Sequence, residues 1–301
     1  MPLSREDRWL TGCLLLSLTL AALLTGLNAA AFRFTGICYF PRQSTPLLLI
    51  ALQFAYFDPC HRFVSPRASF ILKSCALYGL ANVALALFVS GLQFTPFPPI
   101  DAALRRWDHA LRFDTAAALA WTAARPPLRA FLDLCYVSTD AQLLLAPLVA
   151  GFAFDRRRMR VYLYAFVYAF LGGGLFYYFF PSSGPASIYR SPHFADVQLL
   201  TSLKFFQVHH RQEVRTMLGG MIAFPSFHVA WAVLTTYAAL PSRRLFAAVA
   251  ALNALVVAST VLLGWHYLVD VPAGLLLGAA SLYAGARTHR RLEGQDAPRT
   301  P

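Results

Sequence analysis

Long apolar runs separated by short polar segments dominate this chain. Runs of spanning or near-spanning length lie at about residues 10–31, 46–58, 69–93, 133–154, 161–180, 222–240, 245–263 and 266–286. A transmembrane helix needs roughly 20 predominantly apolar residues, so the 46–58 run alone is clearly short and is either tilted or re-entrant. The pattern predicts an all-α, polytopic transmembrane helix bundle.

Composition and charge agree with this fold class. The 301 residues are 57% hydrophobic and 13% charged, whereas soluble domains carry about 25% charged residues. The net charge of +12 is also typical of nucleic-acid-binding proteins, but here the arginines cluster between apolar runs. We therefore expect no nucleic-acid partner and interpret the charge as topogenic and as contact with anionic lipids. The five scattered cysteines predict neither a disulfide framework nor a zinc site.

Arginine clusters predict how the bundle is oriented. They lie at residues 156–160, at residues 243–244 and in the tail from residue 287. If the runs alternate across the membrane, all three clusters face the cytoplasm, as the positive-inside rule requires. Both termini are then cytoplasmic, and the starts of the runs that carry His228 and His266 face outward.

Residues 97–132 also contain arginines but would face outward in this topology. The pattern from Ile100 to Trp107 is amphipathic, and Pro126-Pro127 interrupts the segment. We expect interfacial helices that lie along the headgroups, where arginine carries less weight as an orientation signal. The run Gly172-Gly173-Gly174 predicts close packing between helices.

Two histidines stand at the edges of apolar runs, where an ionisable side chain is costly and usually functional. They are His228 and His266, and Asp270 follows His266 by four residues. On a helix, this spacing puts the imidazole and the carboxylate on one face, so that they can form a hydrogen bond. Two histidines and an orienting carboxylate are typical of covalent or acid–base catalysis.

Phosphoryl transfer without a metal needs a nucleophile, an acid for the leaving oxygen and groups that hold the phosphate. His266 oriented by Asp270 fits the first role, and His228 fits the second. Ser226 precedes a helix N-terminus and suits phosphate binding, although it can also simply cap that helix. The acidic residues form no cluster suited to magnesium, so we expect no metal and no other cofactor.

Cations for the phosphate are expected from the outward segment before His228. If residues 198–217 are helical, Lys204, Arg211 and Arg215 fall on one continuous face. We expect these three side chains to bind substrate phosphate. A basic face of this kind also contacts lipid headgroups, which is the alternative interpretation.

Two motifs resemble the second and third signatures of the type 2 phosphatidic acid phosphatase superfamily, P-S-G-H and S-R-x5-H-x3-D. They read Pro225-Ser226-Phe227-His228 and Ser259-Thr260-x5-His266-x3-Asp270. With the upstream segment Phe180-Pro181-Ser182-Ser183-Gly184-Pro185, they look most like the branch that contains inositol-phosphorylceramide synthases. The resemblance covers roughly residues 95–286.

The resemblance implies a six-helix catalytic core whose site lies at the outer membrane face and needs no metal. It implies that His266 attacks phosphorus to form a phosphohistidine, that Asp270 orients it, that His228 protonates the leaving alkoxide and that Ser226 holds the phosphate. We place this catalytic domain at residues 69–286. Residues 1–68 then form about two further spans, and residues 287–301 form a basic cytoplasmic tail.

Three positions depart from the family motifs. Phe227 replaces a glycine, Thr260 replaces an arginine, and the Lys204-x6-Arg211 pair lacks the proline of the first motif, K-x6-R-P. The departures motivate one alternative, a non-catalytic lipid transporter or interaction protein. The intact histidines and Asp270 argue against it, because ionisable groups in a membrane are costly to keep.

We expect a membrane enzyme that acts on a lipid phosphate at the external leaflet of a plasma (inner) membrane. If water resolves the phosphohistidine, the enzyme is a phosphatase. If a lipid hydroxyl resolves it, the enzyme is a phosphotransferase of the inositol-phosphorylceramide synthase type. We favour the phosphatase, because water needs no dedicated acceptor pocket.

Overall fold

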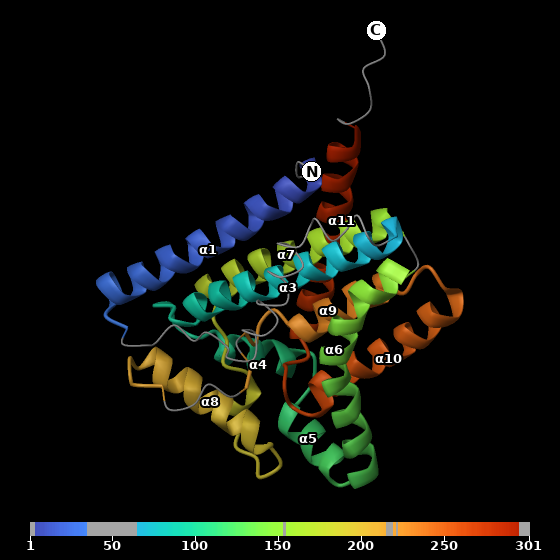
Figure 1. Cartoon of the computed structure of the whole chain (residues 1–301). Helices are drawn as coiled ribbons and strands as arrows, with labels where there is room; N and C mark the ends of the chain where they lie inside the picture. The colour runs from blue at the N-terminus through green and yellow to red at the C-terminus, as the bar shows by residue number, and fades with distance from the viewer. Residues whose placement is uncertain (1–3, 35–64, 153–154, 215–218, 221, 295–301) are drawn as a thin grey trace.

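The computed structural model describes residues 4–34, 65–152, 155–214, 219–220 and 222–294. Within these ranges it contains helices and connecting segments and no strand, so the all-α prediction is confirmed (Figure 1). The α-helices are α1 (Arg5–Phe32), α3 (Pro66–Gln93), α4 (Asp101–Ala110), α5 (Thr115–Ala123), α6 (Pro126–Phe152), α7 (Arg156–Phe179), α8 (Asp196–His209), α9 (Phe227–Ala238), α10 (Arg243–Leu262) and α11 (Asp270–Gly294).

The long apolar helices make the chain a multi-pass membrane protein. Among the described helices, α1, α3, α6, α7 and α10 are long and apolar enough to cross a membrane. The run expected at 222–240 is helical only in α9, whose 12 residues span about 18 Å at 1.5 Å per residue. The run expected from residue 266 becomes helical only at Asp270, and the 46–58 run lies outside the described residues.

Helix α7 is the centre of the bundle. Its residues from Tyr162 to Val167 are at most 1% exposed, and it packs against α1, α3, α6, α9 and α11. A helix that is apolar on all sides is stable when other helices surround it. A Cβ on Gly173 would lie 2.8 Å from side-chain atoms of both Leu277 and Phe227. The predicted close packing at this glycine run is confirmed.

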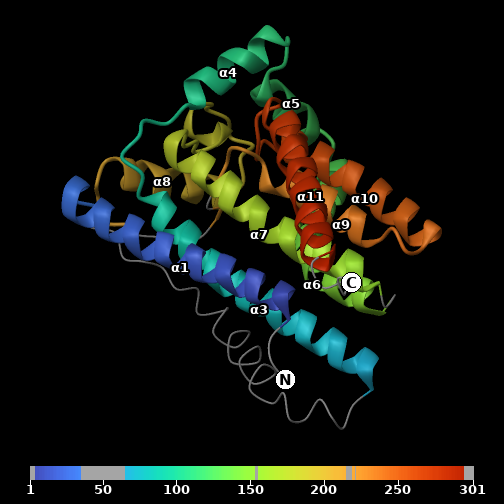
Figure 2. The same ribbon diagram turned by 90° about the horizontal axis from the view of Figure 1, so that it is seen from above.

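Helix α1 runs along α3 outside the central helices (Figure 2). At its start, the carboxylates of Asp7 and Glu6 lie 2.6 Å and 3.4 Å from the guanidinium of Arg160 on α7. Glu6 also lies 2.7 Å from Nδ1 of His289 on α11. These contacts join the starts of α1 and α7 to the end of α11 at one end of the bundle.

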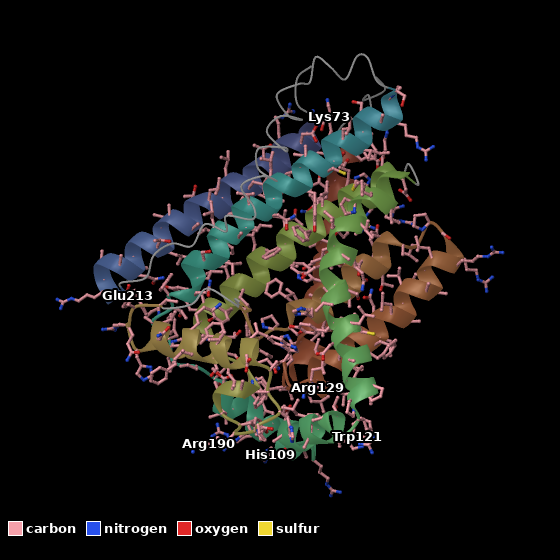
Figure 3. The ribbon with its side chains drawn as sticks, turned by 60° about the horizontal axis from the view of Figure 1, so that its bottom comes forward. Lys73, His109, Trp121, Arg129, Arg190 and Glu213 are labelled. Carbon is pink, nitrogen blue, oxygen red and sulfur yellow. The ribbon has the colours of Figure 1, made fainter. Side chains whose placement is uncertain are left out.

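Helices α4, α5 and α8 gather at the opposite end, away from the start of α1 and the end of α11 (Figure 1). In the segment 97–132, where interfacial helices are expected, the structure has α4 and α5, and α6 begins at Pro126. Their large apolar side chains Trp107 and Trp121 are 54% and 48% exposed. Figure 3 shows His109, Trp121 and Arg190 at this end of the molecule and Lys73 of α3 at the other end.

Candidate active site

Helices α9 and α11 approach each other closely because α11 carries two glycines, Gly274 and Gly278. A Cβ on Gly274 would lie 2.5 Å from the carbonyl oxygen of Ser226, and a Cβ on Gly278 would lie 3.1 Å from that of Ala230. The two glycines are one turn apart and share a face with Asp270, the first residue of α11. This packing brings the start of α11 beside the start of α9.

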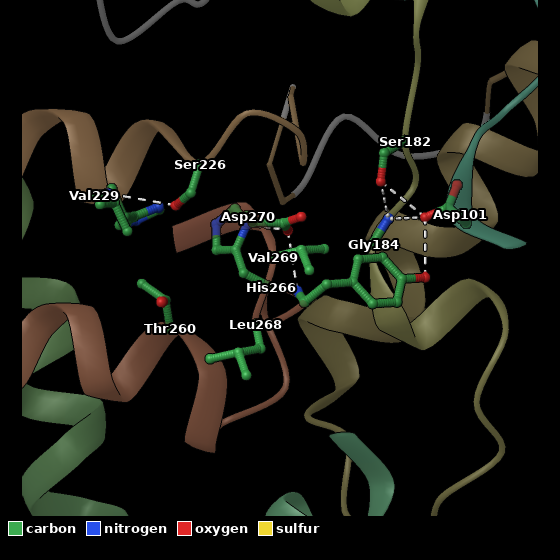
Figure 4. A network of polar contacts seen from close by, with 12 residues as sticks. Asp101, Ser182, Gly184, Ser226, Val229, Thr260, His266, Leu268, Val269 and Asp270 are labelled. Carbon is green, nitrogen blue, oxygen red and sulfur yellow. Dashed lines mark hydrogen bonds and ion pairs between the residues drawn. The ribbon is translucent and has the colours of Figure 1, made fainter. Parts of the chain in front are cut away.

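His266 and Asp270 form a buried pair at this junction (Figure 4). Nδ1 of His266 lies 3.1 Å from Oδ2 of Asp270, and the two residues are 4% and 0% exposed. The spacing of four residues suggested that His266 lies on the same helix as Asp270. In the structure, His266 lies in the loop between α10 and α11. When Nδ1 donates to the carboxylate, Nε2 keeps its lone pair, which is the state that a nucleophile needs.

His228 faces this pair from the first turn of α9. Its ring centroid lies 5.9 Å from that of His266, at an interplanar angle of 62°. Tyr136 of α6 stacks on His228 with centroids 4.2 Å apart, and its hydroxyl lies 3.5 Å from Nδ1 of His228. Trp265 in turn stacks on Tyr136 at 5.0 Å. The stack of aromatic rings fixes the plane of the His228 imidazole.

Both histidines line one pocket. Its other walls are residues 183–186, one face of α8, residues 220, 222 and 223, and the aromatic pair Tyr136 and Trp265. The sequence motifs that lie far apart in the chain therefore meet at one pocket.

Comparison with known families identifies the chain. A family model described as PAP2 superfamily matches residues 102–284, which is more than half of the chain. This chain belongs to the PAP2 superfamily. No curated protein and no solved structure matches it. Members of the superfamily are phosphatases or phosphotransferases, so the protein is an enzyme of that type.

The helix expected over residues 198–217 in this PAP2 protein ends at His209, so Lys204 and Arg211 do not share one helical face, and their role in phosphate binding stays a prediction. Helix α8 ends at His209, and Arg211 lies beyond it with a φ of 55°. Arg211 is exposed and its guanidinium lies 5.8 Å from the ring centroid of Phe34 at the end of α1. Arg215 lies outside the described residues. Residues 210–213 are all exposed, so continuing the helix there would bury no apolar side chain.

Lys204 is buried beside the pocket instead of pointing into it. It is 1% exposed, and its Nζ donates to the carbonyl oxygen of Gly220 at 2.7 Å. Burial lowers the pKa of the Lys204 ammonium to about 8. Gly220 and Phe205, the residue after Lys204, line the pocket. Among the described residues, no lysine or arginine lines the pocket directly.

Two further motif residues have local structural partners. The Ser226 hydroxyl is fully buried and accepts the Val229 N–H at 3.4 Å, so it caps α9. Thr260, at the position of the motif arginine, donates its hydroxyl to Val257 and accepts the His266 N–H at 2.9 Å through its carbonyl. Thr260 therefore closes the end of α10 and attaches the loop that carries His266.

Proposed function

We propose that this protein is a lipid-phosphate phosphatase that works through a phosphohistidine on His266, without a metal, at the external membrane face. The observation that carries the proposal is the buried His266–Asp270 pair facing His228 across one pocket. The arrangement supplies a nucleophile, its orienting carboxylate and an acid on the opposite side.

The reaction has two balanced steps. In the first, Nε2 of His266 forms a bond to phosphorus while the bond from phosphorus to the lipid oxygen breaks, and protonated His228 gives its proton to that oxygen. Asp270 stabilises the charge that develops on His266. In the second, neutral His228 takes a proton from water as the water oxygen attacks phosphorus, which releases His266 and inorganic phosphate.

We propose Ser226, Lys204, Arg211 and Arg215 as the phosphate-binding set. Of the cations, Lys204 has the best support, because the carbonyl that it contacts belongs to Gly220 in the pocket wall. Ser226 begins α9 next to His228, where backbone amides favour an anion.

The exposed residues of α4 and α5 support a lipid substrate. Arg105, Arg106 and Trp107 are exposed on α4, Trp121 is exposed on α5, and Arg125 is exposed just after α5. Arginine and tryptophan are the residues that anchor helices at a bilayer surface. We propose that these helices contact anionic headgroups of the external leaflet, with both chain termini in the cytoplasm of a plasma-membrane protein.

A phosphotransferase of the inositol-phosphorylceramide synthase type is the second candidate. The apolar pocket walls at Phe205 and Ile222 favour it, because apolar side chains suit a lipid acceptor better than they suit water. The catalytic groups serve either reaction, since only the acceptor differs.

Phosphate release in detergent with EDTA tests the proposal. We expect the purified protein to release inorganic phosphate from phosphatidic acid or a related lipid phosphate at an unchanged rate when EDTA is present. Loss of activity with EDTA, restored by a divalent cation, would contradict the metal-free mechanism. Transfer of a headgroup phosphate from a phospholipid to a lipid alcohol, without free phosphate, would replace the phosphatase by the transferase. If neither free phosphate nor a transfer product forms under any condition, the result would favour a non-catalytic lipid transporter or interaction protein.

A further inference from the structure

Helix α4 turns a stripe of buried residues toward the site. Asp101, Leu104 and Asp108 lie at i, i+3 and i+7, and each is at most 3% exposed. Two carboxylates on a buried stripe are unusual, because a buried acid is stable only when hydrogen-bond donors surround it. Both acids of α4 have such donors, and the donors come from loops at the active site.

Asp108 holds the chain between the two catalytic groups of the His266 loop. Its Oδ2 accepts the N–H of Leu268 at 2.9 Å, and its Oδ1 accepts the N–H of Val269 at 3.0 Å. Leu268 and Val269 lie between His266 and Asp270 in the sequence. Hydrogen bonds to an ionised acceptor are roughly twice as strong as neutral ones, so this carboxylate restrains the loop firmly.

Asp101 holds the same loop and a second one. It accepts the Tyr267 hydroxyl at 3.2 Å, the Ser182 hydroxyl at 2.8 Å and the amides of Ser183 and Gly184 at 2.9 Å each (Figure 4). Ser183 and Gly184 line the pocket. Burial raises the pKa of the Asp101 carboxyl, and these hydrogen bonds partly offset that rise.

We propose that Asp101 and Asp108 form a clamp on α4 that positions His266 for attack on phosphorus. The clamp rests on the proposed function of His266 as nucleophile. Neither carboxylate lines the pocket, so both are positioning residues that act through the loop of residues 266–270. Between them they hold Tyr267, Leu268 and Val269, which are all the residues that separate His266 from Asp270.

The substitution Asp108→Asn tests the clamp with little change of shape. One acceptor oxygen becomes an NH₂ group, which then faces the N–H of Leu268 or Val269. We expect kcat to fall by about 10²-fold, the cost of moving a catalytic group by about 1 Å, while KM changes little. We also expect faster hydrogen exchange at the amides of Leu268 and Val269, with unchanged exchange in α7. The matched control is Asp114→Asn, because Asn caps α5 as well as Asp does.

A double-mutant cycle separates positioning from a general loss of structure. In a His266→Ala background, Asp108→Asn is expected to leave the residual rate unchanged, because the group that it positions is gone. If Asp108→Asn lowers the residual rate of the His266→Ala protein by the same factor as it lowers the wild-type rate, the clamp proposal is wrong. Unchanged exchange at Leu268 and Val269 would also overturn it, whether or not the protein releases phosphate. Wild-type protein without any phosphate release would contradict the proposed function alone.

If Asp108→Asn does not fold, Asp101→Asn serves as the second variant. We then expect faster exchange at the amides of Ser183 and Gly184 and a fall in kcat. Normal exchange at both amides in that variant would overturn the clamp.

Discussion

Replacement of His266 by alanine is expected to lower phosphate release from lipid phosphates by at least about 10³-fold, because loss of a nucleophile removes the covalent route. The imidazole lies 3.1 Å from Asp270 and lines the pocket. The measurement is inorganic phosphate release in detergent, at saturating substrate and with EDTA, by variants purified in the same way.

The matched control for His266→Ala is His210→Ala. His210 is exposed at the end of α8, and its ring stacks on Phe206 outside the pocket. We expect this variant to keep wild-type activity. Activity of His266→Ala close to that of the wild type would show that another group attacks phosphorus.

Replacement of His228 by alanine is expected to lower the same rate by about 10²–10⁴-fold, the usual contribution of a general acid. The loss should depend on the leaving group. A lipid alkoxide is a strong base and needs a proton from His228, whereas p-nitrophenolate leaves without one. We therefore expect His228→Ala to lose far less activity on p-nitrophenyl phosphate than on phosphatidic acid. The measurement is kcat for both substrates.

His266→Ala supplies the comparison for this substrate test. It should be equally inactive on both substrates, since both need the nucleophile. If His228→Ala loses the same factor on both substrates, His228 does not protonate the leaving oxygen. If His266→Ala keeps activity on p-nitrophenyl phosphate and His228→Ala does not, then His228 is the nucleophile and His266 is the general acid.

The meeting of the two histidine motifs was predictable from the sequence. His228 and His266 each stand beside a helix end, and alternation of the apolar runs puts both ends on one side of the bundle. The structure brings His228, His266 and Asp270 together as that interpretation requires. Their chemical roles remain predictions.

The cation set was not predictable in the same way. One continuous basic face requires a helix through residues 198–217, but α8 buries its last apolar side chain at Val208 and ends at His209. The motif spacing from Lys204 to Arg211 therefore does not correspond to a helical face. Lys204 packs against Gly220, a glycine that lies 16 residues later and that no periodicity pairs with it.

The residues that support the site are the part that sequence reasoning missed. In the sequence, Tyr136 is an ordinary aromatic residue of an apolar run. Its place in the active site is known only from its contact with His228, 92 positions away. Asp101 and Asp108 belong to the acidic residues that form no cluster suited to magnesium, and the motifs assign them no role. The available signal was their spacing of seven residues, with Leu104 between them on the buried face of an amphipathic helix.

Detection of a phosphohistidine on His266 tests the central claim most directly. Wild-type protein would be mixed with a lipid phosphate labelled at phosphorus, quenched in base within the first turnovers, digested and examined by mass spectrometry. The account predicts a base-stable, acid-labile phosphoryl group on His266, and none on the same peptide of the His266→Ala variant. A phosphoryl group on another residue, or turnover without any labelled histidine, would contradict it.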